Sequence, residues 1–488
     1  MRNNHSTHAP LAGRIHLRSL LWFVMLLALA GCQQEPRLST NSQEAVRHYQ
    51  AGVKERNRFY FNEAKAEFLE ALKADSGFAM GWLGLATVGY FRGSEAEARQ
   101  NITKALALAG RVTPREGFAI RMWDYRIGYR LNEARAAAES LVQRYPDEAC
   151  AYQFLGELAG LTKNQELAAK WFTKAIDLDT AFALAVMSRG YAYSNMGQSD
   201  RAIAEMQRYI RLEPDAADPR ASLADLLVRA GRYQEALAQY QKSLELKPDY
   251  WYAFKSIGSV YALLGRLREA EQQIRTSLDL LPPTSNKEAS LLLIRGEMEG
   301  LRNNYAETAR MAREALAIDS SLGEAAFQLA HALAKTGKFK DADGTIKRLR
   351  EELERRGLRG SVAMGRFHLL RARVLGLEGK YAEAVDACNE SLESTAYIDR
   401  FEVFRILADI RRRMGDTERA LDACSEALSI NNNNPFALLT LVRIYHQRND
   451  AQMTREIAGR LQVLWSKADR DFYPLLELRA ILGGKPPA

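Results

Sequence analysis

The chain has 488 residues, of which 47% are hydrophobic and 26% are charged. This length exceeds what one compact domain usually holds, so we expect several units or an open repeat array. Three arginines and no acid precede Cys32, so the formal net charge of +8 falls to +5 beyond it, and this small excess disfavours a nucleic-acid-binding protein. The four cysteines show no CxxC spacing, which disfavours redox chemistry and a dense disulfide framework.

Residues 1–31 follow the order of a secretory signal peptide. A basic, acid-free head ends at Arg18, and an apolar stretch runs from Leu20 to Ala30, too short to span a bilayer comfortably. The sequence Leu29-Ala30-Gly31-Cys32 resembles the lipobox of bacterial lipoproteins. This resemblance implies cleavage before Cys32, lipidation of its thiol and acylation, typically with palmitate, of the new N-terminus. The alternative interpretation is a short uncleaved anchor, or an ordinary signal peptide followed by a chance cysteine.

Residues 32–44 are polar and contain Pro36, so we expect a flexible tether between the lipid and the folded chain. Gln33 is not the aspartate that tends to retain enteric lipoproteins at the inner membrane. The resemblance therefore implies a lipid-anchored protein at the outer membrane, facing the periplasm.

From residue 45 a residue pattern typical of helices recurs with a period of about 34 residues. Twelve units fit, and they start at Ala45, Ala79, Arg115, Ala149, Ala183, Ala217, Trp251, Ala289, Gly323, Gly365, Phe401 and Pro435. The period and the residue types resemble the tetratricopeptide repeat (TPR). That resemblance implies an all-α fold, a right-handed solenoid of about twelve helix-turn-helix units. Units one to nine cover 45–356, a loose joint covers 357–364, units ten to twelve cover 365–468, and 469–488 form a C-terminal capping helix and tail.

Each unit places small and large residues at fixed positions. A small residue at the eighth place, such as Gly156, should let the second helix approach closely, with a larger residue such as Phe172 at the twenty-fourth place. Alanine recurs at the twentieth place. One helix pair cannot cover its own apolar faces, so stacked neighbours should form the core. Cys388 and Cys424 share the twenty-fourth place of adjacent units, beyond disulfide reach, and are predicted core residues.

The search for catalytic chemistry finds no HExxH, GxSxG, GxGxxG or P-loop motif. The four histidines outside the leader, His48, His331, His368 and His446, lie in different units without metal-ligand spacing. We therefore expect no catalytic residue, metal or cofactor, and an enzyme is disfavoured.

In tetratricopeptide arrays the first helices line the concave surface, and the second, fifth, ninth and twelfth places point into it. Here these places carry large apolar side chains early and basic ones late: Tyr49, Met80, Leu83, Tyr90, Trp123, Met187, Tyr191 and Tyr252, then His331, Arg366, Arg373, Arg405, Arg412 and Arg443. Tyr, Trp, Met and Arg are enriched at protein interfaces, so we predict a partner-binding groove. The alternative is that these residues pack between neighbouring first helices and that the arginines pair with acids such as Glu402 and Asp409.

The expected function is a membrane-anchored scaffold for protein–protein interactions in a cell-envelope machine. Outer-membrane assembly, pilus or secretion systems and exopolysaccharide export all fit this expectation, and nucleic acid is not an expected partner. The alternative is a polysaccharide-binding export component, in which Trp123 and the tyrosines stack on sugar rings and arginines attract uronates. A cryptic envelope enzyme is a third interpretation.

Overall fold

The structure is a computed structural model that describes residues 38–92, 94–162, 164–281, 286–320, 322–355, 362–394 and 400–483. Within these ranges the chain forms α-helices α2 to α26 and one short 3₁₀ helix, η1, without a strand. The predicted all-α fold is confirmed. The predicted signal peptide, Cys32 and the last residues of the tail lie outside the described residues.

The chain divides into two compact units at residues 223 and 224, inside α12. The N-terminal unit, residues 38–223, contains α2 (Gln43–Asn57), α3 (Phe61–Ala74), α4 (Ala79–Phe91), α5 (Glu95–Ala107), η1 (Ala109–Arg111), α6 (Pro114–Ile127), α7 (Leu131–Arg144), α8 (Ala149–Leu161), α9 (Gln165–Leu178), α10 (Ala183–Asn195), α11 (Ser199–Leu212) and the start of α12 (Ala217–Arg229).

The C-terminal unit, residues 224–483, contains the rest of α12 and the helices α13 to α26. Their bounds are α13 (Tyr233–Leu246), α14 (Trp251–Leu263), α15 (Leu267–Asp279), α16 (Asn286–Leu301), α17 (Tyr305–Ile318), α18 (Gly323–Lys335), α19 (Phe339–Arg355), α20 (Val362–Glu378), α21 (Tyr381–Ser394), α22 (Arg400–Met414), α23 (Thr417–Ile430), α24 (Pro435–Gln447), α25 (Ala451–Leu464) and α26 (Tyr473–Ile481).

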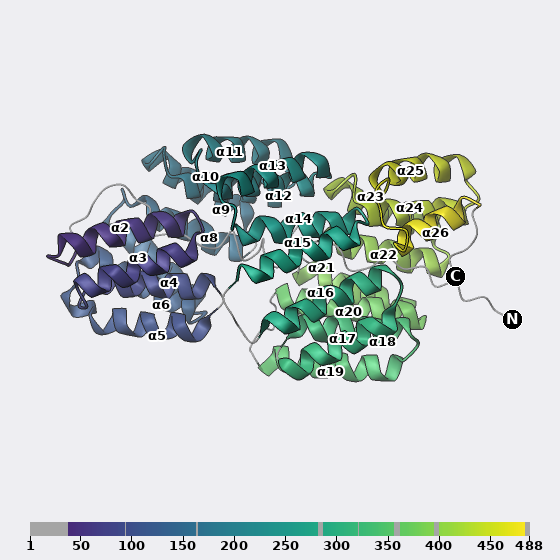
Figure 1. Cartoon of the computed structure of the whole chain (residues 1–488), viewed down its shortest axis with the longest axis horizontal. Coiled ribbons are helices and arrows are strands. Elements are labelled where there is room, and N and C mark those ends of the chain that lie inside the picture. The colour runs from purple at the N-terminus through teal and green to yellow at the C-terminus, as the bar shows by residue number, and fades with distance from the viewer. Residues whose placement is uncertain are drawn as a thin grey trace. The chain divides into compact units, whose positions relative to one another are not determined.

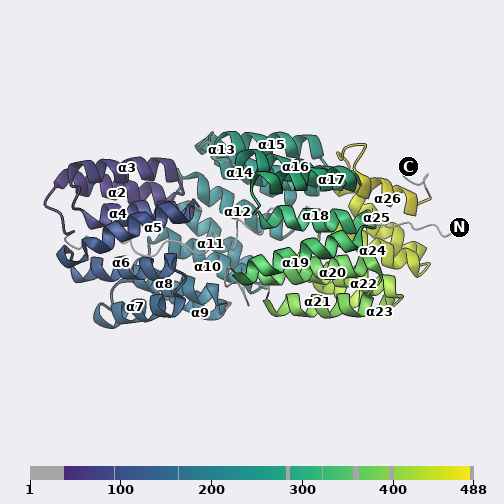
Figure 2. The same ribbon diagram turned by 90° about the horizontal axis from the view of Figure 1, so that it is seen from below.

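Successive helices pair and stack as the repeat prediction requires. The first helix of each of the twelve pairs begins within three residues of its predicted start. Neighbouring helices such as α2, α3 and α4, or α18 to α21, lie side by side (Figures 1 and 2). The helix α26 follows the twelfth pair and packs on α24.

The residue pattern within each pair explains this stacking. A Cβ atom added to Gly156 would lie only 2.4 Å from the ring of Phe172, so the close approach of α8 and α9 requires glycine. The alanines at the twentieth place, among them Ala64, Ala168 and Ala384, are buried completely. Both expectations about the packing positions are confirmed.

In the N-terminal unit, the turn after α2 contacts the region between α11 and α12. The guanidinium of Arg58, after α2, lies 3.1 Å from the carboxylate of Glu213, after α11. The backbone N–H of Ala217 donates to the hydroxyl of Tyr60 at 3.0 Å. These contacts join positions more than 150 residues apart, so side chains inside this turn of the solenoid are enclosed by the repeats around them.

The C-terminal unit closes in the same way. The backbone N–H of Asp469 donates to the carbonyl of Gly265 at 2.9 Å, and Arg302 pairs with Asp471 at 2.8 Å. Gly265 has a φ of +74°, and an added Cβ would lie 2.6 Å from the ring of Phe472. The segment between α25 and α26 therefore docks against the turns that follow α14 and α16.

Candidate functional site

The predicted apolar stripe lies inside the packed structure. Seven of its residues, Tyr49, Met80, Leu83, Trp123, Met187, Tyr191 and Tyr252, have exposed fractions between 0 and 7%, and Tyr90 is partly buried. The Trp123 ring packs edge-on against Tyr90 and Phe154, with centroid separations of 5.9 and 6.3 Å. The Tyr191 hydroxyl donates to Ser222 at 3.1 Å. This is the packing that the alternative interpretation describes, and a role in partner binding stays a prediction.

A buried ion pair lies beside these rings in the N-terminal unit. Arg126 and Glu157 have fully buried side chains, and their charged groups are 3.1 Å apart. The Arg126 guanidinium also lies between 5.4 and 5.8 Å from the ring centres of Tyr90, Trp123 and Phe154. Trp123, at 1% exposed, offers no open face on which a sugar ring could stack.

The predicted arginines of the C-terminal unit are held by carboxylates. Arg373 and Arg405 both bind Glu402, and Arg405 does so through two hydrogen bonds of 2.8 Å. Arg443 makes a forked pair with Glu477 at 2.6 and 2.7 Å. Arg412 pairs with Asp409 at 2.8 Å, and Arg366 pairs with Glu324 at 3.1 Å. Pairing with Glu402 and Asp409 is what the alternative interpretation expects.

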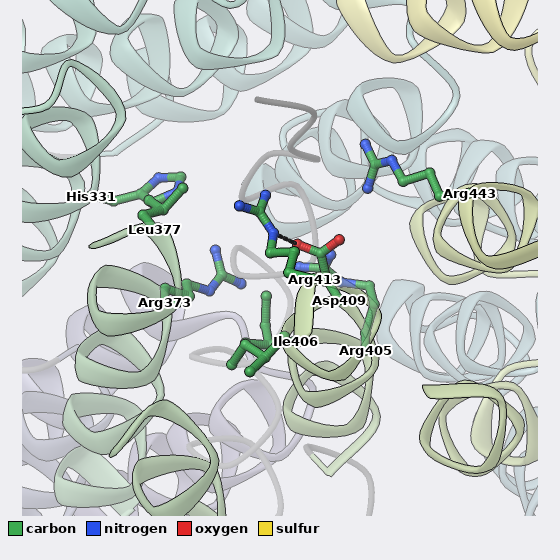
Figure 3. Close-up of a pocket in the computed structure, with 10 residues that line it drawn as sticks. His331, Arg373, Leu377, Arg405, Ile406, Asp409, Arg413 and Arg443 are labelled. Carbon is green, nitrogen blue, oxygen red and sulfur yellow. Dashed lines mark hydrogen bonds and ion pairs between the residues drawn. The ribbon is translucent and has the colours of Figure 1, made fainter. Parts of the chain in front are cut away.

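Three of these arginines, Arg373, Arg405 and Arg443, line a small cavity. Its lining combines charged and apolar side chains: His331, Arg373, Arg405, Asp409, Arg413 and Arg443, with Gly376, Leu377, Ile406 and Ile410. Figure 3 shows Asp409 beside Arg413, with Arg373 and Arg443 directed toward the same space from two other helices. The cavity encloses about 30 Å³, which is room for about two water molecules. It could admit the tip of one polar side chain.

Positive groups outnumber negative ones around this cavity. Arg373, Arg405, Arg413 and Arg443 line it, whereas Asp409 is the one carboxylate in its described lining. Glu402 pairs with both Arg373 and Arg405, and Glu477 pairs with Arg443. Burial lowers the pKa of Arg405 to about 10, Asp409 opposes that change and Arg443 adds to it. Although burial alone would lower the pKa of Arg443, its pair with Glu477 holds that pKa above the ordinary value.

A separate depression of about 270 Å³ lies in the same unit. It is lined by Asn303, Asn304, Tyr305, Ala306, Lys335 and Thr336. The Lys335 ammonium lies 4.8 Å from the Tyr305 ring centre, and among the described residues no carboxylate lies within ion-pair distance of it. Tyr305 also packs edge-on against His331, which lines the cavity, with ring centres 5.8 Å apart. Its buried hydroxyl has no hydrogen-bond partner among the described residues, which is unusual for a buried phenol.

Burial lowers the pKa of Lys335 well below its ordinary value, and the positive charges of Arg413 and Arg443 lower it further. Asp409 and Glu477 oppose this shift without cancelling it. Burial likewise raises the pKa of Tyr305, and the charges of Arg373 and Arg443 lower it. Both side chains therefore lie within the electrostatic field of the arginines that line the cavity. We call this pair the Tyr305–Lys335 rim.

Sequence reasoning missed several of these residues for identifiable reasons. Arg126 stands at the twelfth place of its unit, and Glu157 stands at the ninth place of its own. The repeat numbering alone could have found these two residues. Tyr305 belongs to a second helix, and Lys335 stands one place beyond the twelfth, so the rule for concave positions excludes both.

The described residues offer neither a metal site nor a membrane-spanning helix. No group of three or more His, Cys, Asp or Glu side chains there could hold a metal ion. None of the helices in the described ranges has the length and apolar character needed to cross a membrane.

Comparison with known proteins identifies the repeats. Two family models described as tetratricopeptide repeat match this chain, one at residues 187–250 and 221–283 and the other at residues 150–182. Residues 150–283 therefore contain tetratricopeptide repeats. The Photosystem I assembly protein Ycf3 of Prochlorococcus marinus (strain MIT 9313) is 37% identical over 95 residues, or 19% of this chain. The match spans 51% of that relative, about half its length.

Solved structures resemble this chain at low sequence identity. Human IFIT1 is 16% identical, with 93% of this chain and all of that one covered and a TM-score of 0.42. Yeast Tom70 is 13% identical, with 91% and 96% covered and a TM-score of 0.37. These likenesses concern the fold alone.

Proposed function

We propose that the chain is a lipid-anchored scaffold of the bacterial cell envelope, which holds another protein through an acidic group seated at the basic cavity of its C-terminal unit. Tetratricopeptide repeats mediate protein–protein interactions, which supports a binding role rather than catalysis. The lipobox-like sequence that ends at Cys32 supports the lipid anchor and the envelope location. Assembly, secretion and export machines remain equal candidates for the pathway.

The excess of positive charge at the cavity carries this proposal. A buried charge costs free energy unless a partner of opposite sign compensates it. Four arginines and one carboxylate, that of Asp409, are among the described residues that line the cavity, and no carboxylate lies at ion-pair distance from the nearby Lys335 among the described residues. An additional carboxylate would relieve this imbalance. The size of the cavity suits one side-chain tip, and the depression at the Tyr305–Lys335 rim has room for the chain that carries it.

A pair of neighbouring arginines gives a matched test of the proposal. Arg413 lines the cavity, whereas Arg411 on the same helix donates to the carbonyl of Arg419 outside it. We expect Arg413→Gln to lose a defined envelope protein in a pull-down from native membranes, while Arg411→Gln retains it. Asp409 keeps Arg412 as its partner in the first variant, so the fold should survive. Equal retention by both variants would place the partner on another surface.

The anchor needs a separate test. With Cys32→Ser, palmitate labelling should disappear and the protein should leave the membrane fraction, because several acyl chains provide stable anchoring. Labelling that persists in this variant would contradict lipidation at Cys32.

A further inference from the structure

The described chain begins before the first repeat helix, and this beginning is fastened to the fold. The Ser39 backbone N–H and hydroxyl both donate to the carboxylate of Glu116, at 3.0 and 3.1 Å. The Thr40 hydroxyl donates to Asp75 at 2.5 Å. Ser42 then caps α2 by accepting from the N–H of Ala45. The end of the predicted 32–44 tether is therefore bound to the N-terminal unit, because charge-assisted hydrogen bonds hold it there.

These contacts share one edge of the N-terminal unit. Ser42 precedes α2, Asp75 lies in the turn before α4, and Glu116 lies in the first turn of α6. Glu116 is itself fixed, since it accepts from the N–H of Thr113 in a capping box. The edge that gathers the N-terminal ends of α2, α4 and α6 is therefore where the first described residues of the chain are bound to the fold. We call it the entry edge.

The fastening shortens the reach of a lipid on Cys32. Ser39 is seven positions after Cys32, and a fully extended chain of seven residue steps spans at most about 25 Å. A free tether to Ala45 would span about 45 Å. The repeat helices of this unit, with 13 to 15 residues, are themselves about 20 Å long. The segment between Cys32 and Ser39, which we call the leash, can therefore reach hardly farther than the length of one repeat helix of this unit.

We propose that the entry edge of the N-terminal unit is a membrane-facing surface, held against the lipid headgroups by the short leash between Cys32 and Ser39. This inference rests on the proposed lipidation of Cys32. It makes the Ser39–Glu116 and Thr40–Asp75 contacts positioning elements for the anchored protein. The opposite edge, where Tyr129 stands 58% exposed in the turn between α6 and α7, lies one helix length farther from the bilayer.

The test uses the full-length lipidated protein in vesicles of phosphatidylethanolamine and phosphatidylglycerol. A photo-crosslinking p-benzoylphenylalanine replaces either Ser76, exposed on the entry edge beside Asp75, or Tyr129 on the opposite edge. We expect at least fivefold more lipid adducts from position 76 than from position 129. Equal yields from the two positions would overturn the proposal.

A second variant separates the leash from the surface. A nine-residue Gly-Ser insertion after Gln34 lengthens the reach without touching the fold, and Ser39→Pro with Thr40→Val releases the fastening. Both changes should lower the yield at position 76 severalfold, while the protein stays in the vesicle fraction. An unchanged yield would show that the leash does not position this edge. The amount of the Cys32→Ser variant in the vesicle fraction is measured separately. This measurement tests lipidation at Cys32, whereas the adduct yield at position 76 tests which edge faces the membrane.

Discussion

The indole N–H of Trp465 donates to the backbone carbonyl of Leu263 at 3.1 Å, across 202 residues of sequence. Trp465 is 1% exposed and packs against Phe472, with ring centres 5.2 Å apart. This contact closes the C-terminal unit, because it joins the end of α25 to the end of α14. The closure explains why the concave positions of this unit are enclosed.

Trp465→Phe should lower the free energy of unfolding of the C-terminal unit by about 1–3 kcal/mol, because it leaves a buried carbonyl unsatisfied and a small void. Trp82→Phe is the matched control. It removes an exposed hydrogen bond to the carbonyl of Ser76 and should cost less than about 0.5 kcal/mol. Urea denaturation followed by circular dichroism measures both values. Equal losses would contradict a closing role for Trp465.

The Arg126–Glu157 pair predicts strong coupling in a double-mutant cycle. Glu157→Gln leaves a fully buried guanidinium without its counter-charge, which should cost about 3–5 kcal/mol of unfolding free energy. Arg126→Met should cost a similar amount, and the double variant should cost clearly less than the sum of the two. Additive losses would show that the two groups do not depend on one another.

Lys335 predicts a specific dependence on pH. Its folded pKa is depressed, first by burial and then by Arg413 and Arg443, while Asp409 and Glu477 oppose the shift. Between that pKa and the ordinary value of about 10.4, the unfolded chain binds more protons, so stability should rise with pH. Lys335→Met should remove this rise.

The pKa itself can be measured by acetylation of single lysines at a series of pH values. Lys380 is the comparison, since its hydrogen bond with Glu378 raises its pKa. The acetylation of Lys335 should reach its midpoint at a lower pH than that of Lys380. The reverse order would contradict a positively charged interior around Lys335.

The two thiols at the twenty-fourth place of adjacent units should be unreactive in the folded protein. Burial raises the pKa of Cys388 and of Cys424 to about 12, and neither thiol is exposed. Thiolates are the reactive form, so iodoacetamide at pH 8 should modify both residues only as fast as the unit opens. Peptide mass spectrometry reads each site separately. Modification at the rate of an exposed thiol would contradict their burial.

The sequence was sufficient for the repeats because their signal is local. Gly156 and Phe172 had to meet if two helices of one unit were to pack, and the structure places them in contact. The contact that closes the C-terminal unit could not be predicted from such local patterns. Gly265 and Phe472 meet through the cumulative curvature of six repeats, and no short-range pattern encodes this curvature.

The same distinction applies to the candidate site. The rule for concave positions identified Arg373, Arg405 and Arg443, which do line the cavity. The rule could not tell an open groove from an enclosed interior, so Trp123 was predicted for partner binding although it is buried. The fastening of Ser39 to Glu116 was hidden as well, because polar residues after a lipobox have the same composition whether they are free or bound.

Photo-crosslinking in intact cells can show whether a partner protein binds at the basic cavity. A p-benzoylphenylalanine at Thr336, exposed on the Tyr305–Lys335 rim, is compared with one at Ile318, which is 40% exposed at the end of α17. We expect one defined envelope protein to be crosslinked from position 336, lost when Arg413→Gln is added and absent from position 318. The same protein captured from both positions, or capture from position 336 that ignores Arg413→Gln, would contradict a partner seated at the basic cavity.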